Sequence, residues 1–333
     1  MDFRTSSLCL IRLYNGVEEC YYRFMKLLLT VIAILIVFLF AVTYYFFNTV
    51  FNRDKWQPLS PSKDSTYDDA SEEGRLWLLA NRKSEEVSVT SFDGLKLKGL
   101  FISGSHTDRT IVCVHGYQMT GFSDFGMKTR FLCSVGYNIL LLDNRAHGMS
   151  EGRYTGFSIL DSKDIVCWCR YLVSDLKQTQ IVLYGISMGG AAVLNAAGNS
   201  DLPEEVKGIV SDCAFADAFR EIAHQIKRAY RLPAFPVVYL YDFWLSVFAK
   251  YSLRDMRPRD SIRNYQGSLL IIHGDKDRLV PVENAHEIYE NASCSKDLLI
   301  VHEASHGRSY LVDKESYEER FKELLDRTDQ VPS

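Results

Sequence analysis

The sequence predicts an α/β protein built on a mostly parallel, eight-stranded sheet with helices on both faces. Two observations favour this class. Short, continuously apolar runs of strand length alternate with stretches of helix length, which is the pattern of parallel strands buried on both faces. Polar motifs follow most of these runs, and such sheets bind ligands beyond the carboxyl ends of their strands. With 333 residues, 47% of them hydrophobic, the chain can bury a core of this size.

The expected strands begin with an antiparallel hairpin at the edge of the sheet. Residues 87–90 and 95–101 alternate between apolar and polar positions, and Asp93-Gly94 between them is a tight-turn signal. Further apolar runs predict strands at 110–114, 138–142, 181–184, 208–211, 268–272 and 297–301. Helices are expected at 70–82, 125–134, 159–174, 188–198, 281–291 and 316–326.

The stretch from Ile181 to Gly190 carries the strongest functional signal. Its apolar run ends in Gly185-Ile-Ser187-Met-Gly189, which matches the pattern G-x-S-x-G, and a helix of small residues follows. In a strand–turn–helix of this kind the serine adopts a strained backbone conformation, and its Oγ stands above the sheet. The flanking glycines are needed because a Cβ there would collide with the neighbouring strand or helix. Ser187 is therefore the expected nucleophile.

A serine hydroxyl needs a base within hydrogen-bond distance, and that base needs an acid to orient it. After a turn of this type the order along the chain is serine, acid, histidine. Asp277 follows the strand at 268–272 and is the expected acid. Asp275, on the same loop, and Asp212, at the end of the preceding strand, are the alternatives.

The expected base is His306, which follows the last strand on a loop of small residues. His302 is its rival, but it lies at the strand end, where packing is the more natural role. We interpret three further histidines as structural because each precedes a glycine at a strand end or loop: His115, His147 and His273. The others are expected at the surface or in the cap: His106, His224 and His286.

The negative charge that develops on the substrate oxygen needs two donors aimed at it in advance. The backbone N–H of Met188, at the start of the helix, is the first expected donor. The loop His115-Gly116-Tyr117-Gln118 is expected to supply the second from the backbone N–H of Tyr117. Gly116 allows the backbone there to approach the substrate closely.

The longest interruption of the strand pattern, 216–266, is predicted to form a cap over the site. It contains a helix candidate at 219–230 and an aromatic stretch at 239–251. We expect most of these aromatic side chains to form the core of the cap and a minority to line an acyl or aryl pocket, since such pockets are mostly apolar.

An uncharged run from Leu27 to Phe47 predicts a transmembrane helix. A cleaved signal peptide would have a shorter apolar core and a small-residue cleavage site, whereas Tyr44-Tyr-Phe-Phe47 occupies that place. The basic residues Arg4, Arg12, Arg23 and Lys26 outnumber Arg53 and Lys55 after the run, which favours an extracytoplasmic position for the C-terminal part at the cell membrane. Met25-Lys26 also resembles a natural start, and a chain that began there would lose most of this asymmetry.

Composition excludes several other classes. The net charge is −4 and no basic run with interleaved aromatic residues occurs, so the sequence does not favour nucleic-acid binding. The eight cysteines are scattered, and Cys167-Trp-Cys169 is neither a redox C-x-x-C nor half of a zinc site. We expect no disulfide framework, no metal and no organic cofactor.

Taken together, the motifs from about residue 87 to 326 resemble those of the α/β-hydrolase superfamily of serine esterases, lipases and peptidases. They are His115-Gly116, the loop 143–152, the serine turn 185–189, Gly274-Asp-Lys-Asp277 with Val280-Pro281, and Ser305-His-Gly307. The resemblance implies Ser187, Asp277 and His306 as nucleophile, acid and base. Together with the N-terminal run it is similar to membrane-anchored bacterial hydrolases of this superfamily.

The resulting expectation is a membrane-anchored serine hydrolase that cleaves small or lipid-like carboxylic esters, or amides, through an acyl-serine. The expected segments are an N-terminal flank (1–26), an anchor (27–50), a linker with a leading helix (51–85) and an α/β-hydrolase domain (86–328). A serine peptidase of the same fold and a non-catalytic, membrane-tethered binding protein are the alternatives. A dehalogenase or epoxide hydrolase would need a carboxylate where Ser187 stands.

Overall fold

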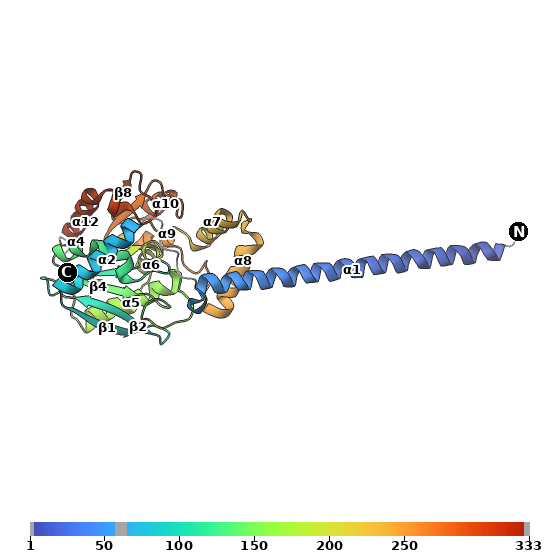
Figure 1. Ribbon diagram of the computed structural model, residues 1–333, viewed down its shortest axis with the longest axis horizontal. Helices are drawn as coiled ribbons and strands as arrows, with labels where there is room; N and C mark the ends of the chain where they lie inside the picture. Colours follow the sequence, from blue (N-terminus) through green and yellow to red (C-terminus); the bar gives the residue numbers. More distant parts are fainter. Residues whose placement is uncertain (1–2, 57–64, 330–333) are drawn as a thin grey trace. The chain divides into compact units, whose positions relative to one another are not determined.

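The computed structural model describes residues 3–56 and 65–329. By internal contacts the chain forms two units, Met1–Asn48 and Thr49–Ser333. Helix α1 (Phe3–Phe51) runs without a break through the basic flank and the apolar run (Figure 1). Its part Glu18–Phe51, 34 residues long, is the single described helix that is long and apolar enough to cross a membrane.

The second unit is built on an eight-stranded sheet in the order β1-β2-β4-β3-β5-β6-β7-β8. The strands are β1 (Ser84–Thr90), β2 (Lys96–Ile102), β3 (Arg109–Val114), β4 (Asn138–Asp143), β5 (Gln180–Ile186), β6 (Val206–Asp212), β7 (Ser268–Gly274) and β8 (Ser295–Val301). The pairs β1–β2 and β2–β4 are antiparallel, and all the other neighbouring pairs are parallel. The predicted fold class, including the edge hairpin, is confirmed.

Most helices outside the cap lie close to the predicted ranges, but where one helix was expected at 125–134 two short helices occur, and the first begins at residue 121. The helices with predicted counterparts are α2 (Ser65–Asn81), α3 (Gly121–Phe125), α4 (Thr129–Ser134), α5 (Ile159–Ser174), α6 (Met188–Ala197), α10 (Glu283–Asn291) and α12 (Lys314–Asp329). A short helix that the sequence did not indicate, α11 (Ser309–Val312), precedes α12. The stretch 216–266 holds α7 (Ala218–Tyr230), α8 (Ala234–Trp244), a π-helical segment η3 (Leu245–Ala249) and α9 (Pro258–Ser261).

The register of the parallel strands brings the polar motifs to one edge of the sheet. Every residue of β5 is buried, because helices cover both faces of the sheet, and this explains its unbroken apolar run. Ile186 at the end of β5 pairs with Asp212 at the end of β6, and Asp212 pairs with Ile272 in β7. The loops after these strands therefore emerge side by side, which is where we expect the site.

Helix α5 begins with a buried carboxylate that makes the stability of the fold depend on pH. The Ser158 N–H donates to Asp161 Oδ2 at 2.7 Å, whereas Oδ1 is buried and has no hydrogen-bond partner in the described part of the chain. Burial raises the pKa of Asp161 to about 7, although the Arg145 guanidinium lowers it. An unfolded aspartate releases its proton near pH ~4. The folded state therefore holds the extra proton between these values, and stability falls as the pH rises through that window.

Replacing Asp161 by Asn should remove this part of the pH dependence. We expect Asp161→Asn to raise the free energy of unfolding at pH ~8 by a few kcal/mol, at most about 4, and to change it much less at pH ~4. Chemical denaturation of the full chain in detergent at both pH values measures the difference. Asp175→Asn, exposed after the last residue of the same helix, is the control. A difference from wild type that is equal at both pH values would contradict the prediction.

Candidate active site

Ser187 occupies a strained turn between β5 and α6. Its backbone has φ 55° and ψ −116°, a conformation that a residue with a side chain rarely adopts. A Cβ on Gly185 would lie 2.2 Å from the carbonyl oxygen of Gly189, and a Cβ on Gly189 would lie 2.0 Å from that of Val114. Both glycines are therefore required by close backbone packing, as the sequence pattern predicts for a serine presented above a sheet.

Three side chains that the sequence singled out lie in one hydrogen-bonded row. His306 Nε2 lies 2.9 Å from Ser187 Oγ, and His306 Nδ1 lies 2.6 Å from Asp277 Oδ2. A carboxylate can only accept, so Nδ1 carries the proton and Nε2 is left to accept the serine hydroxyl. This is the tautomer in which the imidazole can take a proton from Ser187.

Asp277 is held in one orientation by three hydrogen-bond donors and a longer contact with His273. The backbone N–H groups of Leu279 and Val280 both donate to Oδ1 at 2.9 Å, and His306 binds Oδ2. His273 Nε2 also lies 3.3 Å from Oδ2 and donates to the carbonyl oxygen of Val280. Burial alone would raise the pKa of Asp277, but the hydrogen bonds from His273 and His306 lower it well below its usual range. Asp277 is thus a carboxylate at all ordinary pH values.

The alternative acids and the rival base lie elsewhere. Asp275 Oδ2 lies 2.7 Å from Nδ1 of His302, and that imidazole is 80% exposed. Asp212 is buried and accepts a hydrogen bond from the Tyr317 hydroxyl at 2.8 Å. Asp212 still supports the turn, because its backbone carbonyl accepts from the Ser187 N–H at 2.8 Å.

The loop after β3 is placed against the serine by a buried carboxylate that sequence reasoning missed. Asp124 Oδ2 accepts the Gly116 N–H at 2.6 Å, and a Cβ on Gly116 would lie 3.4 Å from Ser187 Cβ. Within the described residues the neighbouring backbone N–H of Tyr117 has no acceptor. Met188 is the first residue of α6, so its N–H has no partner inside the helix. These are the two expected oxyanion donors.

Two buried histidines connect this loop with the loop after β4. The backbone N–H of Gln118 donates to His147 Nε2 at 3.1 Å, and that of Asn144 donates to His115 Nε2 at 3.0 Å. Burial lowers the pKa of His115 to about 4 and that of His147 to about 3, so both rings stay neutral and can accept. Their role here is to hold the loops.

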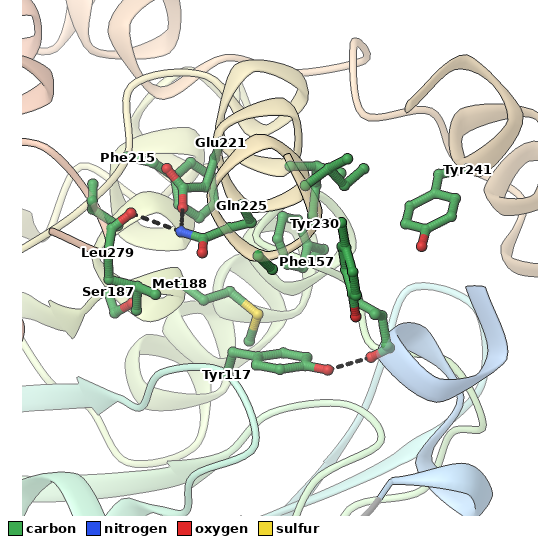
Figure 2. Close-up of a pocket in the computed structure, with 15 residues that line it drawn as sticks. Tyr117, Phe157, Ser187, Met188, Phe215, Glu221, Gln225, Tyr230, Tyr241 and Leu279 are labelled. Atoms are coloured by element: carbon green, nitrogen blue, oxygen red, sulfur yellow. Dashed lines mark hydrogen bonds between the residues drawn. The ribbon is translucent and has the colours of Figure 1, made fainter. Parts of the chain in front are cut away.

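A cavity of about 310 Å³ opens beside Ser187 (Figure 2). Most of its wall is apolar, and helix α7 supplies much of it through Ile222, Ile226, Ala229 and Tyr230. Tyr241 is the one residue of the aromatic stretch 239–251 that lines this cavity. The other aromatic rings of the wall come from outside the cap: Tyr117, Phe157 and Phe215.

The wall contains one buried carboxylate, Glu221, which the sequence did not indicate. Gln225 Nε2 donates to Glu221 Oε1 and to the carbonyl oxygen of Leu279, the latter at 2.7 Å. Burial raises the pKa of Glu221, although the hydrogen bond from Gln225 lowers it. This pair is a polar spot in an otherwise apolar cavity (Figure 2). No group of His, Cys, Asp and Glu side chains that could hold a metal ion occurs among residues 18–56 and 66–329.

The sheet order, the strained serine turn and the cap between β6 and β7 define the class of protein. The family model described as the alpha/beta hydrolase fold matches residues 109–251. The chain has the α/β-hydrolase fold, and over most of its length it is similar to esterase-like proteins of the α/β-hydrolase superfamily.

Bacterial and archaeal proteins are among the relatives of this chain. The uncharacterized protein YqkD of Bacillus subtilis is 29% identical over 243 residues, which are 72% of this chain and 78% of YqkD. The uncharacterized protein YfhR of Escherichia coli is 27% identical over 228 residues, 67% of this chain and 73% of YfhR. The solved structure of the Pyrococcus furiosus esterase Pf2001 matches with a TM-score of 0.61 at 25% identity, covering 82% of this chain and 95% of the esterase.

Proposed function

We propose that this chain is a membrane-anchored serine hydrolase that cleaves carboxylic esters through an acyl-Ser187 intermediate. The observation that carries the proposal is the row from Asp277 to His306 to Ser187, with 2.6 Å and 2.9 Å between the hydrogen-bonding atoms. A row of this kind beside an apolar cavity has the geometry that nucleophilic catalysis by serine requires.

In the proposed reaction, Ser187 Oγ attacks the ester carbonyl carbon while His306 Nε2 takes the hydroxyl proton. Asp277 keeps the imidazole in the required tautomer and stabilises its positive charge. The negative charge on the carbonyl oxygen is accepted by the backbone N–H groups of Tyr117 and Met188, helped by the N-terminus of α6. His306 then returns the proton to the leaving alcohol, and a water molecule, activated in the same way, releases the acid from Ser187.

An ester with a lipophilic acyl or aryl group is the substrate class that the cavity supports best. The wall beside Ser187 consists mainly of aromatic and aliphatic side chains, which favour such groups through burial of apolar surface. The relative Pf2001, which is similar over most of both chains, is an esterase.

Helix α1 is the proposed anchor. The unit Thr49–Ser333, which we call the catalytic unit, is proposed to lie outside the cytoplasm. The part Glu18–Phe51 of α1 is 34 residues long, enough to cross a hydrocarbon core. The basic residues that precede the apolar run outnumber those that follow it, which favours an N-terminus in the cytoplasm. Protease added to intact cells should therefore reach the catalytic unit, and its protection there would contradict this orientation.

Labelling with a fluorophosphonate probe tests the proposed nucleophile. We expect the wild-type chain to be labelled covalently and Ser187→Ala to lose labelling and ester hydrolysis, because Ser187 is the one serine among the described residues whose hydroxyl is hydrogen-bonded to His306. Ser305→Ala, on the loop that carries His306, should keep both. Equal labelling of Ser187→Ala and wild type would overturn the assignment, and no labelling of either would favour a binding protein. Parallel assays with p-nitrophenyl esters of graded chain length and aminopeptidase substrates separate esterase from peptidase.

A further inference from the structure

Helix α8 of the cap and the π-helical segment η3 that follows it are apolar on both their buried and their exposed sides. Val238 and Tyr241 of α8 and Leu245 of η3 are buried. On the exposed side Phe235 is 71% exposed and Tyr239 47%, and Val247 of η3 is 40% exposed. Leu232, in the connection from α7, adds a further exposed apolar side chain at 46%. A helix that is apolar all round is normally covered on every side, so an exposed face of this kind indicates a second apolar environment.

The chain enters the catalytic unit next to this helix. The Phe51 and Tyr241 rings pack edge to face with centroids 6.4 Å apart, and Val50 lines the same cavity as Tyr241 and Tyr230. The Tyr117 hydroxyl donates a hydrogen bond to the backbone carbonyl oxygen of Val50, and Figure 2 marks this bond by the dashed line from Tyr117. The last turn of α1 is therefore built into the wall of the cavity beside α8.

Chain connectivity brings this wall close to the proposed membrane. The uncharged run that starts at Leu27 reaches Phe47 and continues without a charge to Asn52. Val50 lies three residues after Phe47, so their Cα atoms can be at most about 11 Å apart, whatever the arrangement of the two units. If the run crosses a bilayer, the cavity wall lies at its surface.

The charges around α8 suit a lipid surface. Lys227, Arg228, Arg231 and Lys250 are all exposed on or beside the cap helices, and Asp242 is the one acidic residue between Lys227 and Lys250. Asp242 is engaged by the Ser252 hydroxyl and the Leu253 N–H at 2.8 Å and 2.7 Å. Basic side chains that surround an apolar helix face are attracted to anionic lipid headgroups.

Helix α2 also exposes apolar residues, but the charges that accompany them differ from those around α8. Leu76 and Leu79 are 55% and 47% exposed on α2. Their helix carries four acidic residues, Asp68, Asp69, Glu72 and Glu73, against the single basic Arg75. Anionic headgroups would repel this face, so α2 provides matched control positions on the same unit.

We infer that α8 lies in the interfacial region of the bilayer that α1 spans, with Leu232, Phe235, Tyr239 and Val247 in contact with lipid. The inference rests on the proposed anchoring by α1 and deepens the proposed function. The cavity wall that includes Tyr230 and Tyr241 then faces the membrane surface, and lipophilic esters dissolved in the bilayer reach Ser187 without crossing bulk water. Short, water-soluble esters need no such route.

Tryptophan quenching in vesicles tests the contact directly. The full chain and its Phe235→Trp variant are reconstituted into phosphatidylcholine vesicles with a minor share of phosphatidylglycerol, with and without brominated phosphatidylcholine. The emission that the new tryptophan adds should fall by about half or more with brominated lipid, as for a side chain a few ångströms below the headgroups. Leu76→Trp is the control, and its added emission should respond to aqueous iodide and not to brominated lipid.

Ester hydrolysis by a variant with acidic residues on the exposed apolar face tests the proposed route of lipophilic substrates to Ser187. Leu232→Glu/Phe235→Glu should lower the rate on a long-chain p-nitrophenyl ester dissolved in the vesicles about tenfold, because the charges lift α8 from the lipid. Its rate on water-soluble p-nitrophenyl acetate should stay unchanged. The matched pair Leu76→Glu/Leu79→Glu should leave both rates at the wild-type level. Equal loss on both esters would mean damage to the cap and would overturn the proposed route.

The possible outcomes distinguish a failure of the inference about α8 from a failure of the proposed function. Release of the chain from membranes by alkaline carbonate would refute the proposed anchor. Absence of fluorophosphonate labelling of the wild-type chain would refute the proposed hydrolase activity. With both intact, a tryptophan at 235 that is quenched by iodide and not by brominated lipid overturns the docking of α8. A tryptophan at 235 shielded from both quenchers also overturns it, and points to a protein partner such as a second copy of this chain.

Discussion

Asp277→Asn should lower kcat/KM for ester hydrolysis by about 10³–10⁴-fold while the chain still folds. The reason lies in the donors around the carboxylate. The N–H groups of Leu279 and Val280 both point at Oδ1, so the oxygen of an asparagine amide must take that position. The amide NH₂ then replaces Oδ2 and faces His306 Nδ1. This forces the imidazole proton onto Nε2, where it can no longer accept the Ser187 hydroxyl.

The control for this variant lies on the same loop. Asp275 has the same side chain, but it binds the exposed His302, so Asp275→Asn should keep activity within about twofold of wild type. Both variants are assayed with a soluble p-nitrophenyl ester, and thermal unfolding checks that each is folded. A loss in Asp277→Asn that is no greater than the loss in Asp275→Asn would show that Asp277 does not orient the base.

Local sequence signals account for the sheet and for the candidate site residues. Strands buried on both faces produce unbroken apolar runs, and the loops after them bring Ser187, Asp277 and His306 to one edge of the sheet. The G-x-S-x-G turn is equally local, because its glycines are required by contacts within the strand–turn–helix and with the end of β3. Signals of this kind need no knowledge of distant packing.

Features that depend on distant packing could not be predicted in the same way. The aromatic stretch 239–251 was expected to supply lining residues, yet most of the cap's contribution comes from α7, and Tyr241 alone represents that stretch. Composition shows that a segment is apolar, but it does not show whether its partner is the protein core, a substrate or lipid. Val50 is a further case, since it lies at the end of the N-terminal helix and reaches the cavity only through tertiary contacts.

His273 and Asp124 illustrate the limit for single side chains. His273 was interpreted as structural from its place before a glycine, and it lies 3.3 Å from the carboxylate of Asp277. Asp124 lies just before the helix expected at 125–134, and its contact with Gly116 depends on how α3 packs against the loop after β3. The pattern of apolar and polar residues in the sequence does not reveal a buried carboxylate that binds a backbone N–H.

Asp124→Ala should lower kcat about 100-fold and change KM little, because the proposed oxyanion donor Tyr117 acts mainly in the transition state. Asp124 acts as a positioning residue. Its carboxylate, 4% exposed, holds the Gly116 N–H at 2.6 Å and thereby the adjoining N–H of Tyr117. Without that acceptor the loop can move away from the position where the substrate oxygen becomes negative. Burial raises the pKa of Asp124, but the hydrogen bond from Gly116 and the nearby Lys128 ammonium lower it.

The conservative variant separates positioning from simple stability. Asp124→Asn retains an oxygen toward Gly116, and its NH₂ can donate to the Tyr67 hydroxyl, which lies 3.4 Å from the other carboxylate oxygen. We therefore expect Asp124→Asn to restore most of the kcat lost in Asp124→Ala, and Tyr67→Phe to remain close to wild type. Steady-state kinetics with a soluble ester and thermal unfolding of all three variants measure this. If kcat instead follows the unfolding temperature across the series, Asp124 supports the fold alone and the oxyanion loop does not depend on it.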